Sequence, residues 1–538
     1  MSVAAAEKQR SFVERPQIRK LDELPLLDRT LIDYDRYQEG ISLSGAAYSM
    51  ALYASRGCPY RCIYCDVYRL NKHHFRRSAE NLFAEVRQLN RIGVRRFDIL
   101  DDIFNVNLKE SLKFFRLVKE HKLDARFNFP IGLRGDLLTP ELVDLMSECG
   151  AGFVSVALES ASPRLQQMIK KFLDIDKLHK NLDYLTANHP NIVLTLFTMV
   201  GFPSETEEEA MMTMEFIHSI RWIDFPQMNT VRVFPGSELE SVALAHGCTR
   251  EQIEASMAGN FLTPDAGLAF GASFGSMLRS KLLKGYYLNR ERLLTRLPHQ
   301  MACYTERELD SFYKQHFRSE RIKGVRDVLK LARIDPEILD RHRFRSEEEL
   351  RVENLGEKLR SLYPRQAKEV DPLRILLIDV SNGLDDTSVL GNQWKSVQPM
   401  GLMALGSFLE AQPFGRRVAI RILNAGFDFD SLEEFDAAVR AFDPELIGFR
   451  VLTIHQALLY KLIATIRGGG LSAPIIVGGP HATSASWEVL ADSEVSLVVA
   501  GEGEYTLAAI VESVLANERH LPDRETLRAI PGVIVRAD

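Results

Sequence analysis

The stretch Met50-Ala-Leu-Tyr-Ala-Ser-Arg-Gly-Cys58-Pro-Tyr-Arg-Cys62-Ile-Tyr-Cys65 determines how the rest of this chain is interpreted. Its first residues, Met50–Ala54, favour a short β-strand, and three cysteines follow at the spacing C-x3-C-x2-C. Three thiolates at this spacing could ligate three irons of a [4Fe-4S] cluster, whose usual cube has a cysteine on every iron. No fourth cysteine is nearby, so the fourth iron would keep an open position for a substrate or cofactor.

The three cysteines could also have a purely structural role. They could be buried thiols, or part of a zinc site that takes its fourth ligand from His73 or His74. The chain has only six cysteines in 538 residues, so three at this spacing by chance are rare. An open iron on a low-potential cluster suits reductive cleavage of S-adenosylmethionine (SAM), which would chelate that iron through its amino and carboxylate groups.

Length and composition describe an ordinary globular protein of several domains. A chain of 538 residues is too long for one core and fits two to four domains. The formal net charge of −6 gives no electrostatic reason to expect nucleic acid or an anionic membrane as a partner. Met1 to Arg10 lack the apolar core of a secretory signal, and no run approaches the ~18 apolar residues of a transmembrane helix. Cys149, Cys248 and Cys303 are scattered like reduced thiols, so we expect a cytoplasmic protein.

Short β-rich runs alternate with helical patterns from about Ser49 to Glu240. Six βα units predict a parallel sheet with right-handed crossovers, open or partly closed as in a (β/α)6 barrel. Active residues of such folds gather at the carboxyl ends of the strands, and the cysteines directly follow the first strand. The expected strands are Met50–Ala54, Arg96–Ile103, Ala125–Ile131, Phe153–Leu158, Ile192–Val200 and Met228–Phe234.

The alternation returns at Asp371, which predicts a second α/β domain of Rossmann-like type. Its expected strands are Ile375–Val380, Arg416–Leu423, Leu446–Val451, Ile475–Val477 and Val495–Val499. The residues between the two sheets have helical periodicity and are interpreted as a connector that covers the barrel mouth, or as a plain spacer. We therefore predict four segments: an extended arm 1–47, a partial barrel 48–240, a helical connector 241–368 and a Rossmann-like domain 369–538.

Polar residues stand at the ends of the second and third strands. Asp101 and Asp102 could accept hydrogen bonds from the amino group of a cluster-bound SAM, or could cap a helix. Arg134 could meet the SAM carboxylate, or could form a surface salt bridge.

The fourth and fifth strands also end in candidate residues. Glu159 and Ser160 could bind ribose hydroxyls, while the competing interpretation is a helix cap made by Ser160 and Ser162. The turn that contains Gly201 and Pro203 could place its backbone beside the adenine. It could equally be a simple strand–turn–helix connection capped by Ser204.

Taken in order, these strand ends resemble the radical SAM superfamily over residues 48–240. The cysteine triplet with Tyr64 before the third cysteine matches the family signature. Leu158-Glu-Ser-Ala-Ser162 is similar to the Glu-Ser-x-Ser stretch of radical SAM methylthiotransferases and cobalamin-dependent relatives. Gly201-Phe-Pro-Ser-Glu-Thr206 resembles the Gly-x-Pro-x-Glu-Thr turn, and Pro235-Gly-Ser237 the Pro-Gly-Ser/Thr turn. The resemblance implies a [4Fe-4S] cluster on Cys58, Cys62 and Cys65, SAM, and an external electron donor such as flavodoxin or ferredoxin.

Three turns of the C-terminal domain resemble the cobalamin-binding domain of cobalamin-dependent radical SAM enzymes. Two of them supply the candidate cofactor contacts, which are Gly478, Gly479, Pro480, His481, Gly501, Glu502 and Gly503. The third is Pro399-Met-Gly-Leu402. A nucleotide-binding domain competes with this interpretation. However, the first turn, Asp379-Val-Ser-Asn-Gly383, is not Gly-x-Gly-x-x-Gly, which disfavours NAD or FAD.

Two features depart from the family pattern. The chain has no histidine between His342 and His455, so the Asp-x-His-x-x-Gly motif that ligates cobalt is absent. The resemblance then implies cobalamin without a protein ligand on cobalt, and His481 as a loop residue near the corrin. The Rossmann-like domain also follows the radical domain in the chain, whereas in the family the cobalamin-binding domain usually precedes it.

The leading hypothesis is a cobalamin-dependent radical SAM enzyme that methylates an unactivated carbon of a small-molecule biosynthetic intermediate. Its cofactors would perform the chemistry, so no further catalytic residue is assigned. A second hypothesis is transfer of another SAM-derived group, such as 3-amino-3-carboxypropyl, or ring formation, with a degenerate cobalamin domain. A third is a cobalamin or SAM sensor without turnover. We expect neither nucleic acid nor a membrane as a partner.

Overall fold

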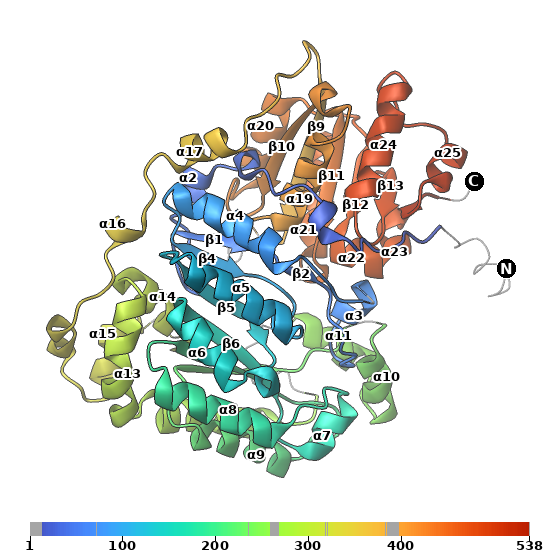
Figure 1. Ribbon diagram of the computed structural model, residues 1–538. Helices are drawn as coiled ribbons and strands as arrows, with labels where there is room; N and C mark the ends of the chain where they lie inside the picture. The colour runs from blue at the N-terminus through green and yellow to red at the C-terminus, as the bar shows by residue number, and fades with distance from the viewer. Residues whose placement is uncertain are drawn as a thin grey trace. The chain divides into compact units, whose positions relative to one another are not determined.

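The computed structural model describes residues 13–71, 73–234, 236–258, 268–317, 319, 321–381, 384 and 397–536. The chain forms two compact units (Figure 1). One consists of Ile41–Val352, and the other joins Met1–Gly40 to Glu353–Asp538. Within the described ranges, every helix is too short or too polar to traverse a lipid bilayer.

Six parallel strands form the central sheet of the Ile41–Val352 unit, in the same order as in the chain. This confirms the predicted α/β sheet. The last strand starts and ends earlier than expected, because Val231 and Val233, which suggested a strand, are buried in a loop instead. The strands are β1 Ser49–Leu52, β4 Arg96–Ile99, β5 Arg126–Leu133, β6 Ala151–Glu159, β7 Val193–Val200 and β8 Phe225–Thr230.

Amphipathic helices connect these strands, and α4, α5, α6 and α8 follow one another along the outside of the sheet (Figure 1). They are α4 Ala79–Arg91, α5 Leu108–Glu120, α6 Pro140–Glu148, α7 Pro163–Met168, α8 Ile175–Asn188 and α9 Glu207–Ser219. Each begins after a side chain that accepts a hydrogen bond from its first turn. These residues are Ser78, Asn107, Thr139, Ser162, Asp174 and Thr206. Ser162 therefore does cap a helix, whereas the alternatives that placed caps at Asp101–Asn105 and at Ser204 were wrong.

The helical stretch after the barrel is attached mainly at the amino ends of the strands. Asp224, directly before β8, accepts hydrogen bonds from Arg296 Nε and Gln300 Nε2, both at 2.8 Å. Arg96, the first residue of β4, pairs with Glu308 at 2.6 Å. All of these side chains are almost fully buried. This part of the connector therefore closes the end opposite to the predicted mouth, which corrects the expectation that it covers the mouth.

Two helices of this stretch lie near the cysteines instead. Leu239 and Ile253, from the first two helices, share a buried cluster with Ile63 of the cysteine loop. The described helices of the whole stretch are α10 Glu238–Ala245, α11 Arg250–Ala258, α12 Ala272–Lys281, the π-helix η5 Leu282–Tyr287, α13 Arg290–Cys303, α14 Glu306–Phe317, α15 Val325–Leu331, η6 Pro336–Arg341 and α16 Glu347–Leu350.

The second unit contains a six-stranded sheet in the order β10-β9-β11-β12-β13-β14. Its five predicted strands are confirmed as β9 Leu373–Val380, β10 Val418–Asn424, β11 Leu446–Val451, β12 Ile475–Gly478 and β13 Leu497–Val499, all parallel. The prediction missed β14, Val533–Ile534, which pairs antiparallel with β13. Two residues are too short a run for alternation to reveal.

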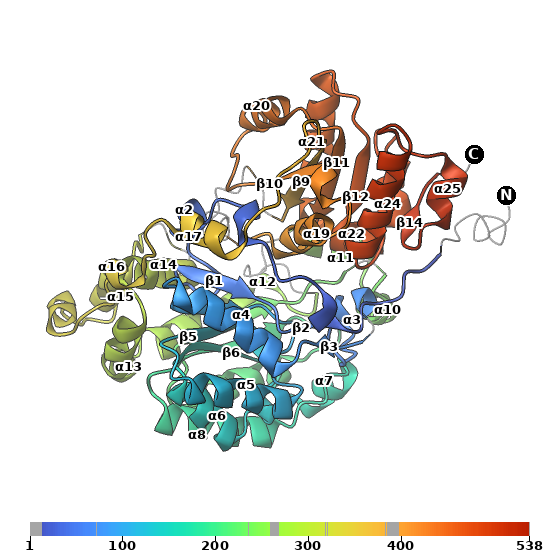
Figure 2. The ribbon, with the colours of Figure 1, turned by 45° about the horizontal axis from the view of Figure 1, so that its top comes forward.

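Helices cover both faces of this second sheet (Figure 2). Helices α20 Leu432–Phe442 and α21 Gln456–Gly468 share one apolar core with the strands, while α19 Met400–Glu410 and α24 Glu504–Ala516 pack together. The remaining helices are α17 Leu355–Leu362, η7 Gly415–Arg417, η8 Thr453–His455, α22 Gly479–Ser484, α23 Ser486–Ala491 and α25 Arg524–Ala529.

The N-terminal arm is a folded part of this second unit. It contains η1 Leu21–Glu23, η2 Arg29–Leu31 and α2 Tyr34–Tyr37. Leu31, Tyr34 and Tyr37 are buried, which differs from the extended linker that the charged, proline-spotted sequence suggested. The apolar side chains of the arm are too irregularly spaced to form a periodic signal.

Candidate functional site

The cysteine loop is held at its base by two carboxylates from the end of β4. It is bordered by the short antiparallel pair β2 Ser55–Arg56 and β3 Phe75–Arg76, and it includes α3 Val67–Leu70. The Asp101 carboxylate accepts hydrogen bonds from Ala54 N at 2.7 Å and Ser55 Oγ at 2.5 Å. Asp102 Oδ2 accepts from Gly57 N at 3.1 Å. Both predicted SAM contacts therefore lie directly beneath the cysteine loop.

Gly57 permits the turn that leads into the first cysteine. Its φ is +77°, and a Cβ at this position would lie 2.2 Å from His73 O. Any other residue would combine an unfavourable backbone conformation with a collision against backbone. The loop thus requires glycine directly before Cys58.

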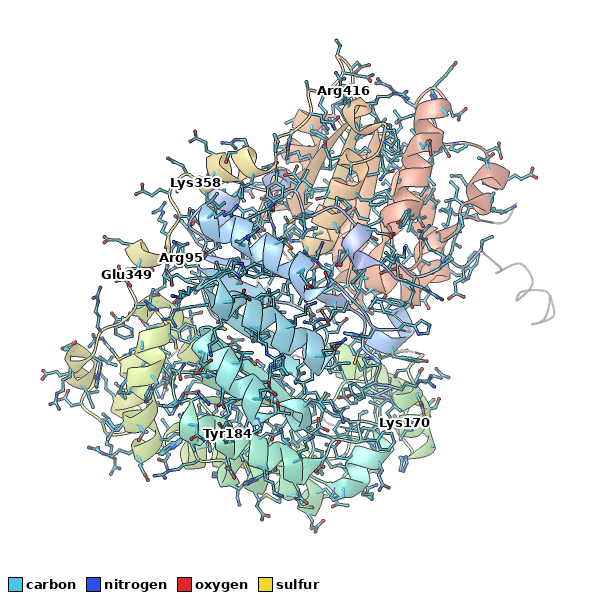
Figure 3. The ribbon with its side chains drawn as sticks, in the orientation of Figure 1. Arg95, Lys170, Tyr184, Glu349, Lys358 and Arg416 are labelled. Carbon is cyan, nitrogen blue, oxygen red and sulfur yellow. The ribbon has the colours of Figure 1, made fainter. Side chains whose placement is uncertain are left out.

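The middle of the loop reaches the other edge of the barrel sheet. Ile63 N donates to Ile169 O at 3.1 Å, and Leu239 N donates to Ile63 O at 3.3 Å. Lys170, labelled in Figure 3, pairs on the surface with Glu238 at 2.5 Å, and its carbonyl oxygen lies 4.0 Å from Cys62 Sγ. The loop between β1 and α4 therefore closes over the carboxyl ends of the strands.

The three thiols are free and half-buried. Burial raises the pKa of Cys58 to about 11 and that of Cys65 to about 12, and it also raises the pKa of Cys62. The thiols are thus protonated at neutral pH in the metal-free protein, and a metal must displace those protons. Across the described ranges, no three His, Cys, Asp or Glu side chains gather to hold a single metal ion, His73 and His74 included. In a cube each thiolate binds a different iron, so the donor set fits a cluster.

Glu159 is held in an unusual conformation beside the cysteine loop. It ends β6 with φ +65°, a value that is uncommon for residues other than glycine and that gathers at functional sites. Its Oε1 accepts from Tyr64 OH at 3.1 Å and from Lys171 Nζ at 2.9 Å. Its Oε2 accepts no hydrogen bond from the residues that the structure describes. This arrangement fits a carboxylate with one oxygen fixed by protein and the other available to a ligand hydroxyl.

Arg134 is more fully engaged than the sequence suggested. Its guanidinium pairs with Asp136 at 2.9 Å, donates to the carbonyls of Lys171 at 3.1 Å and Phe172 at 2.8 Å, and lies 4.0 Å from the ring centre of Tyr60. Three of its five N–H donors make hydrogen bonds, to Lys171 O, Phe172 O and Asp136 Oδ2. Arg134 thus fixes the turn that carries Lys171 against the cysteine loop, and its role toward the SAM carboxylate stays a prediction.

Ser160 and the turn after β7 serve the local structure. Ser160 is fully buried, and its Oγ accepts from Ser162 N at 3.2 Å. Glu205 Oε2 accepts from Gly201 N at 2.6 Å and from Phe202 N at 3.0 Å, and burial raises the pKa of Glu205 to about 8. Glu205 was not among the predicted site residues, although the Gly-x-Pro-x-Glu-Thr turn contains it.

Pro203, in the same turn, is buried. All three residues, Ser160, Gly201 and Pro203, are buried in the structure. Their contacts with SAM stay predictions.

In the second unit, the carboxyl ends of β9 and β11 meet where the strand order reverses. Ligands of open α/β sheets bind outside such a point. Arg450 Nη1, from β11, donates to the Asp379 carboxylate at 3.0 and 3.1 Å and also to Ser381. Gly479, with φ +89°, lies so close that a Cβ would be 2.9 Å from Arg450 Cγ.

His481 is a buried polar residue at this edge. The residue is 2% exposed, and neither ring nitrogen has a hydrogen-bond partner among the residues that the structure describes. Burial lowers its pKa, so the imidazole is neutral at pH 7. A buried polar group without a partner costs about 1–3 kcal/mol, which a ligand with hydrogen-bonding groups would offset. The residue therefore fits a polar cofactor at this edge.

The remaining predicted contacts surround the same strand ends. Gly478 and Pro480 are half-buried beside His481, and Gly501 and Gly503 follow β13. Glu502, between the two glycines, accepts a hydrogen bond from Ile18 N of the arm at 2.5 Å. This contact with a residue 484 positions away could not be seen in the sequence.

Comparison with protein families identifies both domains. Residues 52–217 match the radical SAM superfamily, and residues 389–511 match the B12 binding domain. The chain thus contains a radical SAM domain and, C-terminal to it, a B12-binding domain. These families bind a [4Fe-4S] cluster with SAM, and cobalamin, which are therefore the cofactors of the chain.

Curated relatives resemble parts of the chain. It is 28% identical to the Uncharacterized methyltransferase PH0819 of Pyrococcus horikoshii over 242 residues, 44% of this chain and 50% of that protein. It is 27% identical to the cytidylyl-2-hydroxyethylphosphonate methyltransferase of Streptomyces wedmorensis, over 37% of each. The chain thus spans half or less of these relatives' own length.

Solved structures of radical SAM proteins also resemble parts of the chain. The cobalamin-dependent radical enzyme OxsB with aqua-cobalamin and SAM has 13% identity and a TM-score of 0.34, over 59% of this chain and 54% of its own. The methyltransferase TsrM of Kitasatospora setae has 16% identity and a TM-score of 0.32, over 35% and 38%.

Proposed function

We propose that this protein is a cobalamin-dependent radical SAM methyltransferase that acts on an unactivated carbon of a small-molecule biosynthetic intermediate. The observation that carries the proposal is the presence, in one chain, of a radical SAM domain with three free cysteines and of a B12-binding domain. Methyltransferases among the curated relatives support the same reaction class. The mildly acidic net charge of the chain favours a small-molecule substrate over a peptide.

The chain's own residues bind and orient the cofactors. When bound, the cluster supplies the electron that cleaves SAM, and cobalamin supplies the methyl group. Cys58, Cys62 and Cys65 would hold the cluster, Glu159 would receive a SAM hydroxyl on Oε2, and His481 would meet a polar group of cobalamin. An external reductant, such as flavodoxin or ferredoxin, would supply the electrons.

Products of SAM distinguish this reaction from the alternatives. We expect anaerobic protein with SAM, cobalamin, substrate and reductant to yield 5′-deoxyadenosine and S-adenosylhomocysteine together, because two SAM molecules have separate fates. Transfer of the aminocarboxypropyl group would instead release 5′-methylthioadenosine. A sensor would form none of these nucleosides in catalytic amounts. Chromatography of the reaction mixture separates the three nucleosides from one another.

Glu159→Ala and Asp102→Ala are expected to weaken SAM binding by about 10- to 150-fold, since a hydrogen bond to a charged group contributes roughly 1.5–3 kcal/mol. Equilibrium dialysis with the cluster-loaded protein measures the effect, and iron analysis should show the cluster retained. Glu141→Ala, which removes an exposed carboxylate paired with Arg116, is the matched control. Unchanged SAM affinity in both variants would place the cofactor elsewhere.

Cobalamin bound to the full chain is expected to have no protein nitrogen on cobalt. The motivation is the lack of histidine between residues 342 and 455. Electron paramagnetic resonance of the Co(II) form should therefore show no nitrogen splitting that depends on the protein. Splitting that disappears in His481→Ala would identify this histidine as the ligand and contradict the prediction.

A further inference from the structure

The N-terminal arm contacts the loops at the carboxyl edge of the second sheet, and its first contacts are with the turn after β13. Ile18 N donates to Glu502 Oε2 at 2.5 Å, and the Arg15 guanidinium lies 4.4 Å from the ring centre of Tyr505. Gly532 N donates to Val13 O at 2.8 Å. This end of the arm therefore fixes a turn whose glycines were predicted to contact the cofactor.

The middle of the arm packs on α19. Asp28 N donates to Ser407 Oγ at 2.7 Å. Leu31 fills the space beside Gly406, where a Cβ would lie 2.7 Å from Leu31 Cδ1. Arg29 is fully buried and donates to Tyr34 OH at 2.8 Å. The arm is thus built into the core on this side of the sheet.

The last part of the arm reaches the loops after β9 and β10. Tyr34 OH donates at 2.8 Å to Oε1 of Gln398, which lies just before α19. Tyr37 OH donates to Asp428 Oδ2 at 3.3 Å, and its ring centre lies 3.9 Å from that of Phe427. Asp428 in turn accepts a hydrogen bond at 2.8 Å from the backbone N of Asn424, which is the last residue of β10. The arm therefore contacts three separate loops that follow carboxyl ends of strands.

Those loops belong to the edge where a sheet of this topology binds its ligand. The matched B12-binding family covers residues 389–511 and does not include the arm. Tyr34 and Tyr37 are almost fully buried, and the removal of these large side chains from water stabilises the docked arm. The arm is therefore a fixed element of this edge.

We propose that residues 13–40 are part of the cobalamin site: they hold the turns at Gln398, Asp428 and Glu502 in the arrangement that receives the cofactor. The proposal rests on the cobalamin dependence stated above, and it makes Tyr34 and Tyr37 positioning residues. Cobalamin would then bind to a site assembled from the arm and from loops of the second sheet, although these segments are far apart in sequence.

Two arm variants of the full chain test this. Tyr34→Phe/Tyr37→Phe keeps the buried rings and removes only the two hydroxyl donors, whereas Tyr37→Ala also removes the ring on Phe427. We expect hydroxocobalamin to bind the double variant at least several-fold more weakly than it binds the wild-type chain, and to bind Tyr37→Ala more weakly by roughly tenfold or more. Visible absorbance of the bound cofactor measures both affinities. Hydrogen exchange of the cobalamin-free chain should become faster in peptides around residues 397–400 and 424–430.

Arg440→Ala is the control, because Arg440 is an exposed residue of α20, outside the arm, and pairs with Asp436 at 2.7 Å. Iron content should be the same in all variants, which shows that the Ile41–Val352 unit is intact. Unchanged affinity and unchanged exchange in both tyrosine variants would overturn this inference alone. A wild-type chain that bound no hydroxocobalamin would overturn the proposed function, and the cofactor role of the arm with it.

Discussion

The variant Cys58→Ala/Cys62→Ala/Cys65→Ala is expected to contain no [4Fe-4S] cluster after anaerobic reconstitution, while the wild-type chain binds about four irons and four sulfides. The three thiols lie on one loop that is anchored at two points, by Asp101 at its base and by Ile63 at its middle. Substitution of all three removes every thiolate of the site. Iron and sulfide analysis and the visible absorption of the cluster measure the loss.

Cys248→Ala is the control for this experiment, because it removes a half-buried thiol that lies outside the loop. It should retain the full cluster. A full cluster in the triple variant would show that other residues ligate the iron, and the assignment of the cysteine loop would then be wrong.

Asp224→Ala is expected to destabilise the Ile41–Val352 unit by about 3–5 kcal/mol, since it leaves a buried arginine without its counter-charge. Asp224 accepts hydrogen bonds from Arg296, Gln300 and Leu194 N, all within 2.9 Å, and both charged side chains are 2% exposed or less. Native-state hydrogen exchange of amides in α13 and β8 reports the free energy of opening directly.

Arg116→Ala provides the comparison, because it breaks an ion pair with Glu141 in which both side chains are about 60% exposed. Such a pair contributes at most about 1 kcal/mol. If Asp224→Ala changed the opening free energy no more than Arg116→Ala does, the attachment of α13 to the barrel would depend on other contacts.

The sequence predicted elements whose signal is local and failed where the signal lies in distant contacts. Strands such as β7 and β11 are long enough for their apolar residues to mark them, and the cysteine spacing is itself local. The bonds from Tyr64 and Lys171 to Glu159 join residues that are 95 and 12 positions apart, and no spacing rule connects them. Arg134 could be placed near the mouth, but its engagement with Asp136 depends on the fold of the following turn.

The same reason accounts for the helical connector. Its amphipathic pattern showed that it has a buried face, but Arg296 and Glu308 do not reveal from sequence which end of the barrel they meet. Buried charged residues in a helix are rare without a partner, so they were the available signal for an anchoring point.

The distance along the chain between the arm and its partners has a consequence for biosynthesis. Tyr37 and Asp428 are separated by 391 residues, and at about 5–20 residues per second the ribosome needs roughly 20–80 s to produce the second after the first. During that interval the Ile41–Val352 unit can fold, while Leu31, Tyr34 and Tyr37 have no core to enter. The nascent chain therefore exposes a short apolar segment at least until β10 and the loop after it emerge, and this segment is where a chaperone would bind.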